Sequence, residues 1–493
     1  MHHLKVNIKQ WLLLGSGPLL LWLCSQLNID GLSAQAMLVA GVSGWMIIWW
    51  VSEAVPLPVT SLLPMLLFPL LGVSNAEAAT SPYAHPLIFL FFGGFCLSIA
   101  MEKTDLHKQI AVRALALVGP KPAAQLGAIM LVTAFLSMWM SNTATAVMML
   151  PIALALSSAA PVALQAQLIP ALLLGVAYSA SIGGIATLIG TPPNALLAAF
   201  LAKTYQINIG FGQWMLLGVP LAIITLFACW LWLSRWHFRL HLIAAVQPST
   251  TYTGTQSAKS AEFAPPESAL ATTPSSALTA GLLTAQQKWL AIVFVLTACC
   301  WIFQPLLSKW SGLALSDTVI ALLAAMALFV LPCQGKPLIN WQDSDKIPWG
   351  VLLLFGGGLS MAAQIQQSGL ADYLAGLLNV LDGVRPVFVV LAVVALIVFL
   401  TEVTSNTAVA AAFLPLLGPV ALSLQLSPLY LTVPAALAAS FAFMMPVATP
   451  PNAIVFASGE LRIIDMVKAG FILNLLSIGL ITACCYLILP YWL

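Results

Sequence analysis

Charged residues are scarce in this chain: only 6% of its 493 residues are Asp, Glu, Lys or Arg, whereas 61% are hydrophobic. A soluble domain carries roughly 25% charged residues, so there are too few polar side chains to cover a water-soluble surface. The 17 Lys and Arg nearly balance the 15 Asp and Glu, which leaves no basic stripe for nucleic acid. The composition excludes a soluble fold, disfavours nucleic acid as a partner and predicts an all-α polytopic membrane protein.

Cysteine pairs at metal-binding spacing are also lacking. The eight Cys include no C-x-x-C, and most lie in apolar runs, so we interpret them as packed free thiols. The chain has no H-E-x-x-H and no G-x-S-x-G. These absences, together with the scattered His residues, disfavour an intramembrane enzyme and any organic cofactor.

Long apolar runs make up most of the chain. A membrane-spanning helix needs about 20 mostly apolar residues. The first candidate is interpreted as a retained helix rather than a signal peptide, because it lacks a clear cleavage site and many spans follow it. The candidates, about 11 transmembrane helices, are 11–27, 34–51, 56–73, 86–101, 168–202, 213–234, 288–306, 317–333, 350–366, 430–458 and 469–491, of which 168–202 and 430–458 are broken helices.

Two further apolar stretches, 125–160 and 386–420, are too long for one helix and carry a polar break near the middle. We expect two re-entrant hairpins that enter the membrane and return to the same side. With a cytoplasmic N-terminus, this layout places 14 of the 17 Lys and Arg on the cytoplasmic side, as the positive-inside rule requires. It predicts a multi-pass protein of a cell inner membrane whose C-terminus lies outside.

Residues 242–286 are rich in Ser, Thr, Ala and Pro, a composition that predicts a flexible cytoplasmic linker. On this reading, residues 1–33 form an N-terminal helix. The regions 34–241 and 287–493 then form a first and a second inverted repeat.

The two halves carry the same motifs in the same order. The motif S-N-T occurs at Ser141 and again at Ser405, 264 residues later, and T-P-P-N occurs at Thr191 and again at Thr449, 258 residues later. An odd number of crossings separates equivalent points, so the halves enter the membrane from opposite sides. This is the inverted-repeat plan of secondary transporters.

The S-N-T segments suit an ion and an anion together. Ser141, Asn142 and Thr143 offer neutral oxygens of the kind that a hard cation such as Na⁺ needs. The return helix that begins at such a tip exposes unpaired N–H groups and the positive end of its dipole, which favour a carboxylate.

The T-P-P-N segments predict breaks near the membrane midplane, because proline lacks an N–H and clashes with the preceding helical turn. Proline fits the first turn of the following half-helix. Gly190 and Ala448 lie at the breaks, where small residues leave their carbonyl groups accessible. Polar backbone at that depth occurs only where it lines a cavity or is buried in protein.

Each motif also has a structural interpretation. A single S-N-T is more often an interhelical hydrogen bond, and a single Pro pair is usually a kink; two matched copies of both favour a binding site. Glu402, the one acid beside a tip, is compatible with a functional role and with a structural bond to tip backbone. We find no spare Lys or Arg near the tips, so helix N-termini and bound Na⁺ are expected to supply the positive field.

At these motifs the chain resembles the divalent anion/sodium symporter family, which includes bacterial relatives of the sodium-coupled di- and tricarboxylate carriers. The resemblance covers about residues 40–490. It implies eleven transmembrane helices with two hairpins, a homodimer in the lipid bilayer, and an elevator-type transporter in which a transport domain slides against a scaffold.

The resemblance also implies site residues, carried over motif by motif. The first sodium site would use Ser137, Ser141, Asn142 and the carbonyl of Gly190. The second would use Thr401, the carbonyl of Thr404, Asn406 and the carbonyl of Ala448, with Thr404 the least clear match. The substrate-binding residues would be Asn142, Thr143, Thr191, Asn406, Thr407, Thr449 and Pro450.

The expected function is sodium-coupled symport of C4-dicarboxylates such as succinate, malate or fumarate into the cell, with Na⁺ as the co-transported ion. A sodium-independent dicarboxylate exchanger is the alternative, because some family members need no sodium. An anion channel is disfavoured, since inverted repeats with midplane breaks suit alternating access better.

Overall fold

The computed structural model describes residues 8–119, 121–158, 160–240, 282–333, 335–377 and 383–492. In these ranges the chain is helical apart from one short hairpin of strands, so the predicted all-α class is confirmed. Eight described helices are long and apolar enough to cross a membrane, and six further apolar helices are shorter. The predicted number of eleven spanning helices stays a prediction. Most of the predicted linker, 242–281, lies outside the described residues.

The first half of the chain forms a series of helices that includes one hairpin and one broken helix. In order they are α1 (Ile8–Gln26), α2 (Ala34–Ser52), α3 (Leu57–Thr60), α4 (Leu63–Leu70), α5 (Ala76–Thr80), η1 (Ser81–Ala84), α6 (Pro86–Lys103), α7 (Leu106–Ala116), α8 (Pro122–Ser137), α9 (Asn142–Ser158), α10 (Val162–Gly184), α11 (Pro192–Tyr205), α12 (Phe211–Leu231) and η2 (Trp232–His237).

The second half repeats this order after its first helices. Its elements are α14 (Ala285–Ile302), α15 (Gln304–Ser311), α16 (Asp317–Val330), β1 (Pro332–Cys333), β2 (Lys336–Pro337), η3 (Trp341–Lys346), α17 (Trp349–Gln367), α18 (Leu370–Leu377), α19 (Pro386–Thr401), α20 (Asn406–Ser423), α21 (Leu429–Ala439), α22 (Pro450–Phe456) and α23 (Ile463–Trp492).

Prolines mark the starts of the hairpins and of the second half of each broken helix. Helices α8, α11, α19 and α22 all begin with proline: Pro122, Pro192, Pro386 and Pro450. The missing N–H of proline is harmless there, because the first turn of a helix has no acceptor for it.

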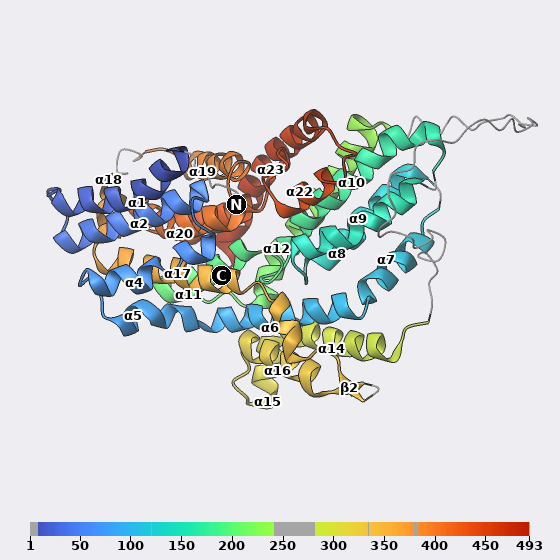
Figure 1. Cartoon of the computed structure of the whole chain (residues 1–493), viewed down its shortest axis with the longest axis horizontal. Coiled ribbons are helices and arrows are strands. Elements are labelled where there is room, and N and C mark those ends of the chain that lie inside the picture. Colours follow the sequence, from blue (N-terminus) through green and yellow to red (C-terminus); the bar gives the residue numbers. More distant parts are fainter. Residues whose placement is uncertain are drawn as a thin grey trace, which may run out of the picture.

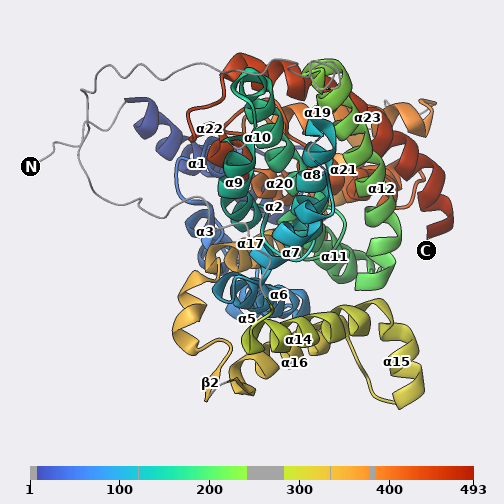
Figure 2. The ribbon, with the colours of Figure 1, turned by 90° about the vertical axis from the view of Figure 1, so that its right-hand side faces the viewer.

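The helices form two groups that meet at the centre of the molecule. Helices α14, α15 and α16 lie together at the lower edge in both views, next to α6 (Figures 1 and 2). Helix α6 packs closely on α16 at Gly93. A Cβ added at Gly93 would lie only 2.5 Å from the carbonyl oxygen of Ala321. The hairpins and broken helices of the two halves form the other group, in which α10 packs on α8 and α9, and α21 packs on α19 and α20.

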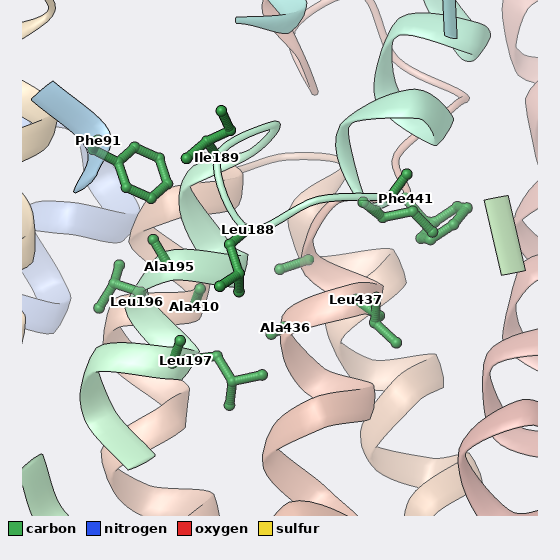
Figure 3. Close-up of a cluster of buried hydrophobic side chains, with 14 of the residues drawn as sticks. Phe91, Leu188, Ile189, Ala195, Leu196, Leu197, Ala410, Ala436, Leu437 and Phe441 are labelled. Carbon is green, nitrogen blue, oxygen red and sulfur yellow. The ribbon is translucent and has the colours of Figure 1, made fainter. Parts of the chain in front are cut away.

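The two halves also interlock. Helix α11 of the first half packs on α20 and α21 of the second, and α22 packs on α9 and α10 of the first. Figure 3 shows part of the resulting core, in which Leu196 and Leu197 of α11 lie near Ala410 of α20, and Leu437 of α21 lies farther across the cluster. Leu188 and Ile189, which precede α11, belong to the same cluster, so this apolar core adjoins the first break (Figure 3).

Candidate substrate and cation site

The four repeated motifs line one cavity of about 650 Å³. Both hairpin tips and both helix breaks contribute to its wall, so segments from opposite ends of the sequence converge. Its motif residues are Ser141, Asn142, Thr143, Gly190, Thr191, Pro192, Ser405, Asn406, Thr407, Ala448, Thr449 and Pro450. Every residue that we predicted to touch substrate is in this set.

The remaining predicted residues lie just behind the cavity lining. Ser137 ends α8 and Thr401 ends α19, and both are fully buried. Thr404 is also buried, and its hydroxyl donates to the carbonyl of Leu400 at 2.8 Å. The Thr404 side chain is therefore turned back to its own helix, and only its backbone carbonyl is left for the role that we predicted.

The first predicted sodium site is a cluster of oxygens. The hydroxyl of Ser137 lies 2.6 Å from the amide oxygen of Asn142 and 2.6 Å from the carbonyl of Ala180. One hydroxyl carries one proton, so it can donate to only one of these two oxygens. The amide group of Asn142 faces the oxygens of Ser137, Ala180 and Gly190, and turning the amide would let its nitrogen donate to all three. With the oxygen inward, the donor set fits a cation.

The second half repeats this geometry with different residues. The hydroxyl of Thr401 lies 2.8 Å from the amide oxygen of Asn406 and 3.1 Å from the carbonyl of Ala439. Again one proton faces two oxygens. Ala180 and Ala439 have no place in the sequence-based prediction, although both lie close to the end of the helix before a break, which is the signal that could have found them.

Ser141 lines the cavity and also caps the start of α9. Its hydroxyl accepts the backbone N–H of Ala144 at 3.2 Å, which satisfies one of the unpaired donors at the start of α9. Thr449 does the same for Asn452 at the start of α22, at 3.2 Å. The other N–H groups of these first turns have no acceptor within their own helix.

The asparagine of each T-P-P-N motif holds its break in shape. The amide nitrogen of Asn194 donates to the carbonyls of Gly184 at 3.2 Å and Thr187 at 2.7 Å. Asn452 donates to the carbonyls of Ala442 at 3.1 Å and Met445 at 3.0 Å. The sequence-based prediction assigns these asparagines no role, although both stand at the fourth position of a repeated motif.

Glu402 also holds a break. Its carboxylate accepts the backbone N–H groups of Phe443 at 2.7 Å, Met444 at 3.0 Å and Met445 at 2.9 Å. It also accepts the side-chain amide of Asn474 at 2.6 Å. Of the two alternatives left open for Glu402, these contacts favour the structural one, but its partner is the segment between α21 and α22 rather than tip backbone.

Residues outside the motifs complete the lining of the cavity. Phe91 and Phe95 of α6 form its apolar part together with Val351 of α17. Glu53 and Lys346 also line the cavity. The expectation that no Lys or Arg lies near the tips is therefore wrong: Lys346 precedes the second tip by about 60 residues in sequence, and only the fold brings it there.

Helix ends give the cavity a positive field in addition. Helices α9, α11 and α20 begin at Asn142, Pro192 and Asn406, all of which line the cavity. Each helix N-terminus acts as roughly half a positive charge. The arrangement can hold carboxylates by backbone N–H groups between two cation-compatible oxygen clusters.

Comparison with known proteins gives a match along nearly the whole chain. Residues 8–493 match the family described as "Sodium:sulfate symporter transmembrane region". A sodium-dependent dicarboxylate transporter, SdcS, of Staphylococcus saprophyticus is 38% identical, covering 98% of this chain and 92% of the relative. SdcS of Staphylococcus aureus strain USA300 is 36% identical, covering 92% and 86%.

Two solved structures share the fold at low sequence identity. The YdaH transporter of Alcanivorax borkumensis matches with a TM-score of 0.54 and 13% identity, covering 91% of this chain and 98% of that one. MtrF of Neisseria gonorrhoeae matches with a TM-score of 0.57 and 11% identity, covering 95% and 97%. At such identity the likeness concerns the fold alone.

Proposed function

The chain belongs to the family of sodium:sulfate symporter transmembrane regions, and from this premise we propose that it carries C4-dicarboxylates such as succinate, malate or fumarate into the cell together with Na⁺. The family relationship confirms the resemblance to divalent anion/sodium symporters, and the chain is a membrane transporter rather than an enzyme. The names of the SdcS relatives support a dicarboxylate as substrate and sodium as the coupling ion.

One observation carries the proposal: two matched oxygen clusters flank a single cavity that faces helix N-termini. Ser137 with Asn142 and Thr401 with Asn406 each bring several neutral oxygens together. A monovalent cation takes oxygen ligands of this kind in each cluster. A carboxylate between Thr143 and Thr407 then meets N–H donors and two nearby cations.

The same fold supports the finer parts of the proposal. The hairpins and broken helices of both halves pack together, as a transport domain that moves as one body would require. The charge distribution of the sequence supports an inner membrane location, a cytoplasmic N-terminus and an outside C-terminus. A homodimer through the other helices, and an elevator movement of the transport domain, complete the proposal.

Uptake of radiolabelled succinate into proteoliposomes tests the function. We expect an inward sodium gradient to drive succinate accumulation, and an equal potassium gradient not to. Asn142→Ala and Asn406→Ala should each abolish uptake while the protein remains monodisperse. Equal uptake with and without the gradient would exclude symport, and stimulation by internal dicarboxylate alone would establish the exchanger instead.

A further inference from the structure

Lys346 stands out as the one basic side chain among the residues that line the cavity, within the described part of the chain. It ends η3. A dicarboxylate carries two negative charges. A lysine that lines the cavity attracts it over a longer range than the helix N-termini do, because the field of a helix end falls off within one turn.

The segment that carries Lys346 is held in place independently of Lys346 itself. Lys103, the last residue of α6, forms an ion pair with Asp343 at 2.6 Å, and Asp343 also accepts the backbone N–H of Asn340 at 2.8 Å. Burial raises the pKa of Asp343, but the hydrogen bonds from Lys103 and Asn340 outweigh it and lower the pKa below its ordinary value. Asp343 thus stays ionised and anchors η3 to α6.

The ion pair of Lys346 is looser than this anchor. Its ammonium lies 3.4 Å from a carboxylate oxygen of Glu102, and the two side chains are 52% and 44% exposed. In the anchor pair, the side chains of Lys103 and Asp343 are 38% and 17% exposed. Exposed ion pairs contribute little to stability, so Lys346 can leave Glu102 for another carboxylate at small cost.

We propose that Lys346 takes part in capturing the transported dianion: it exchanges Glu102 for a substrate carboxylate at the cavity wall and so strengthens the dianion's binding from that side. The inference rests on the proposed function. Glu102 is the competitor that releases the substrate again, because it recaptures the ammonium. In the proposed orientation, Lys346, Glu102 and Lys103 belong to cytoplasmic segments, which makes this the release side during uptake.

Substitutions of Lys346 and Glu102 should change substrate binding in opposite directions. If Lys346 engages substrate, then removing its charge weakens substrate binding, whereas removing the charge of Glu102 strengthens it. If the pair only holds the two segments together, both substitutions act in the same direction. Lys288 provides a matched control, because it is exposed, does not line the cavity and lies at the same end of α6, where its neighbour Gln287 donates to the carbonyl of Thr104 at 2.8 Å.

The experiment measures the KM of sodium-driven succinate transport in right-side-out and inside-out membrane vesicles at low ionic strength. We expect Lys346→Gln to raise the KM about three- to tenfold in inside-out vesicles only, because there the added succinate meets the cytoplasmic face. This is the size of effect that one lost charge near a dianion predicts. Lys346→Arg and Lys288→Gln should keep the wild-type KM, and Glu102→Gln should lower it. The Lys346→Gln effect should shrink below about twofold at roughly 0.5 M inert salt, because screening shortens the reach of the charge.

Several results would overturn the inference. An unchanged KM for Lys346→Gln in both orientations would do so while wild-type transport stands, as would parallel shifts for Lys346→Gln and Glu102→Gln. If the wild-type protein carries no succinate under a sodium gradient, the proposed function is wrong, and the inference about Lys346, which rests on that function, is wrong as well. Should Lys346→Gln not yield folded protein, Glu102→Gln decides alone, since an unchanged or raised KM contradicts the competition.

Discussion

A single methyl group placed at Gly184 should disable the first cation cluster without replacing any of its ligands. Gly184 ends α10 and lies against the side chain of Asn142. A Cβ added there would lie 2.6 Å from the Asn142 amide oxygen and 3.2 Å from its Cγ. Carbon and oxygen do not approach so closely, so the amide must move by roughly 0.5–1 Å, more than the tolerance of about 0.5 Å within which a binding geometry works.

The expected effect is a loss of sodium affinity at constant fold stability. Displacing a ligand through its support typically reduces metal affinity about 10–100-fold, so the half-saturating sodium concentration for succinate uptake should rise by that factor in Gly184→Ala. Alanine is favoured over glycine in a helix by up to about 1 kcal/mol, so the substitution itself does not weaken α10.

Sodium titration of succinate uptake in proteoliposomes provides the assay, and Gly479→Ala in α23 provides the control. A Cβ at Gly479 meets nothing within 4 Å, so this variant should titrate like the wild type. Melting temperatures in sodium-free detergent solution show whether both variants fold. A Gly184→Ala protein whose sodium titration stays within about twofold of wild type would refute the placement of a cation beside Asn142.

Three further predictions follow from the contacts around the site. Glu402→Gln should destabilise the protein by about 2–3 kcal/mol, because one amide oxygen replaces a carboxylate that accepts several N–H groups; an unchanged melting temperature would contradict this. Asn452→Ala should abolish uptake and lower the melting temperature, since two backbone carbonyls lose their donor, whereas activity near the wild-type level would count against the role of Asn452. Asp343→Asn should lower stability at pH 7 by less than about 1 kcal/mol. Because the pKa of Asp343 is lowered in the fold, its contribution is present above the ordinary Asp pKa and is lost as the pH falls through the lowered value, so a difference between wild type and Asp343→Asn that persists below about pH 3 would argue against the ion pair with Lys103.

The breaks and the hairpin tips could be predicted from sequence because their causes are local. Pro192 and Pro450 cannot donate a backbone N–H, and the polar S-N-T segments interrupt runs that are otherwise apolar. Helices α9 and α20 begin at Asn142 and Asn406, within these segments. The convergence of the four motifs on one cavity could be predicted because the motifs are repeated in the same order. A symmetric arrangement of the two halves brings such equivalent segments together.

Lys346 and Glu53 escaped prediction for the opposite reason. Neither belongs to a repeated motif, and both lie outside the apolar runs that define the hairpins. Glu53 reaches the cavity from the end of α2, where its backbone is left-handed with φ 49° and ψ 30°, a conformation that the sequence around it does not signal. Contacts between the two groups of helices depend on long-range packing. Hydrophobic periodicity predicts single helices but not which helices pack together.

The partners of Asn194 and Glu402 have a consequence for the return journey of the carrier. Both side chains satisfy the interrupted backbone from within the protein, so neither break depends on cargo for its hydrogen bonds. A transporter must return to its starting conformation after it releases substrate, and a binding site that unfolded on release would have to refold in every cycle. Here the empty binding site keeps the hydrogen bonds of its breaks. We therefore expect the return step to be a movement of a preformed unit rather than local refolding.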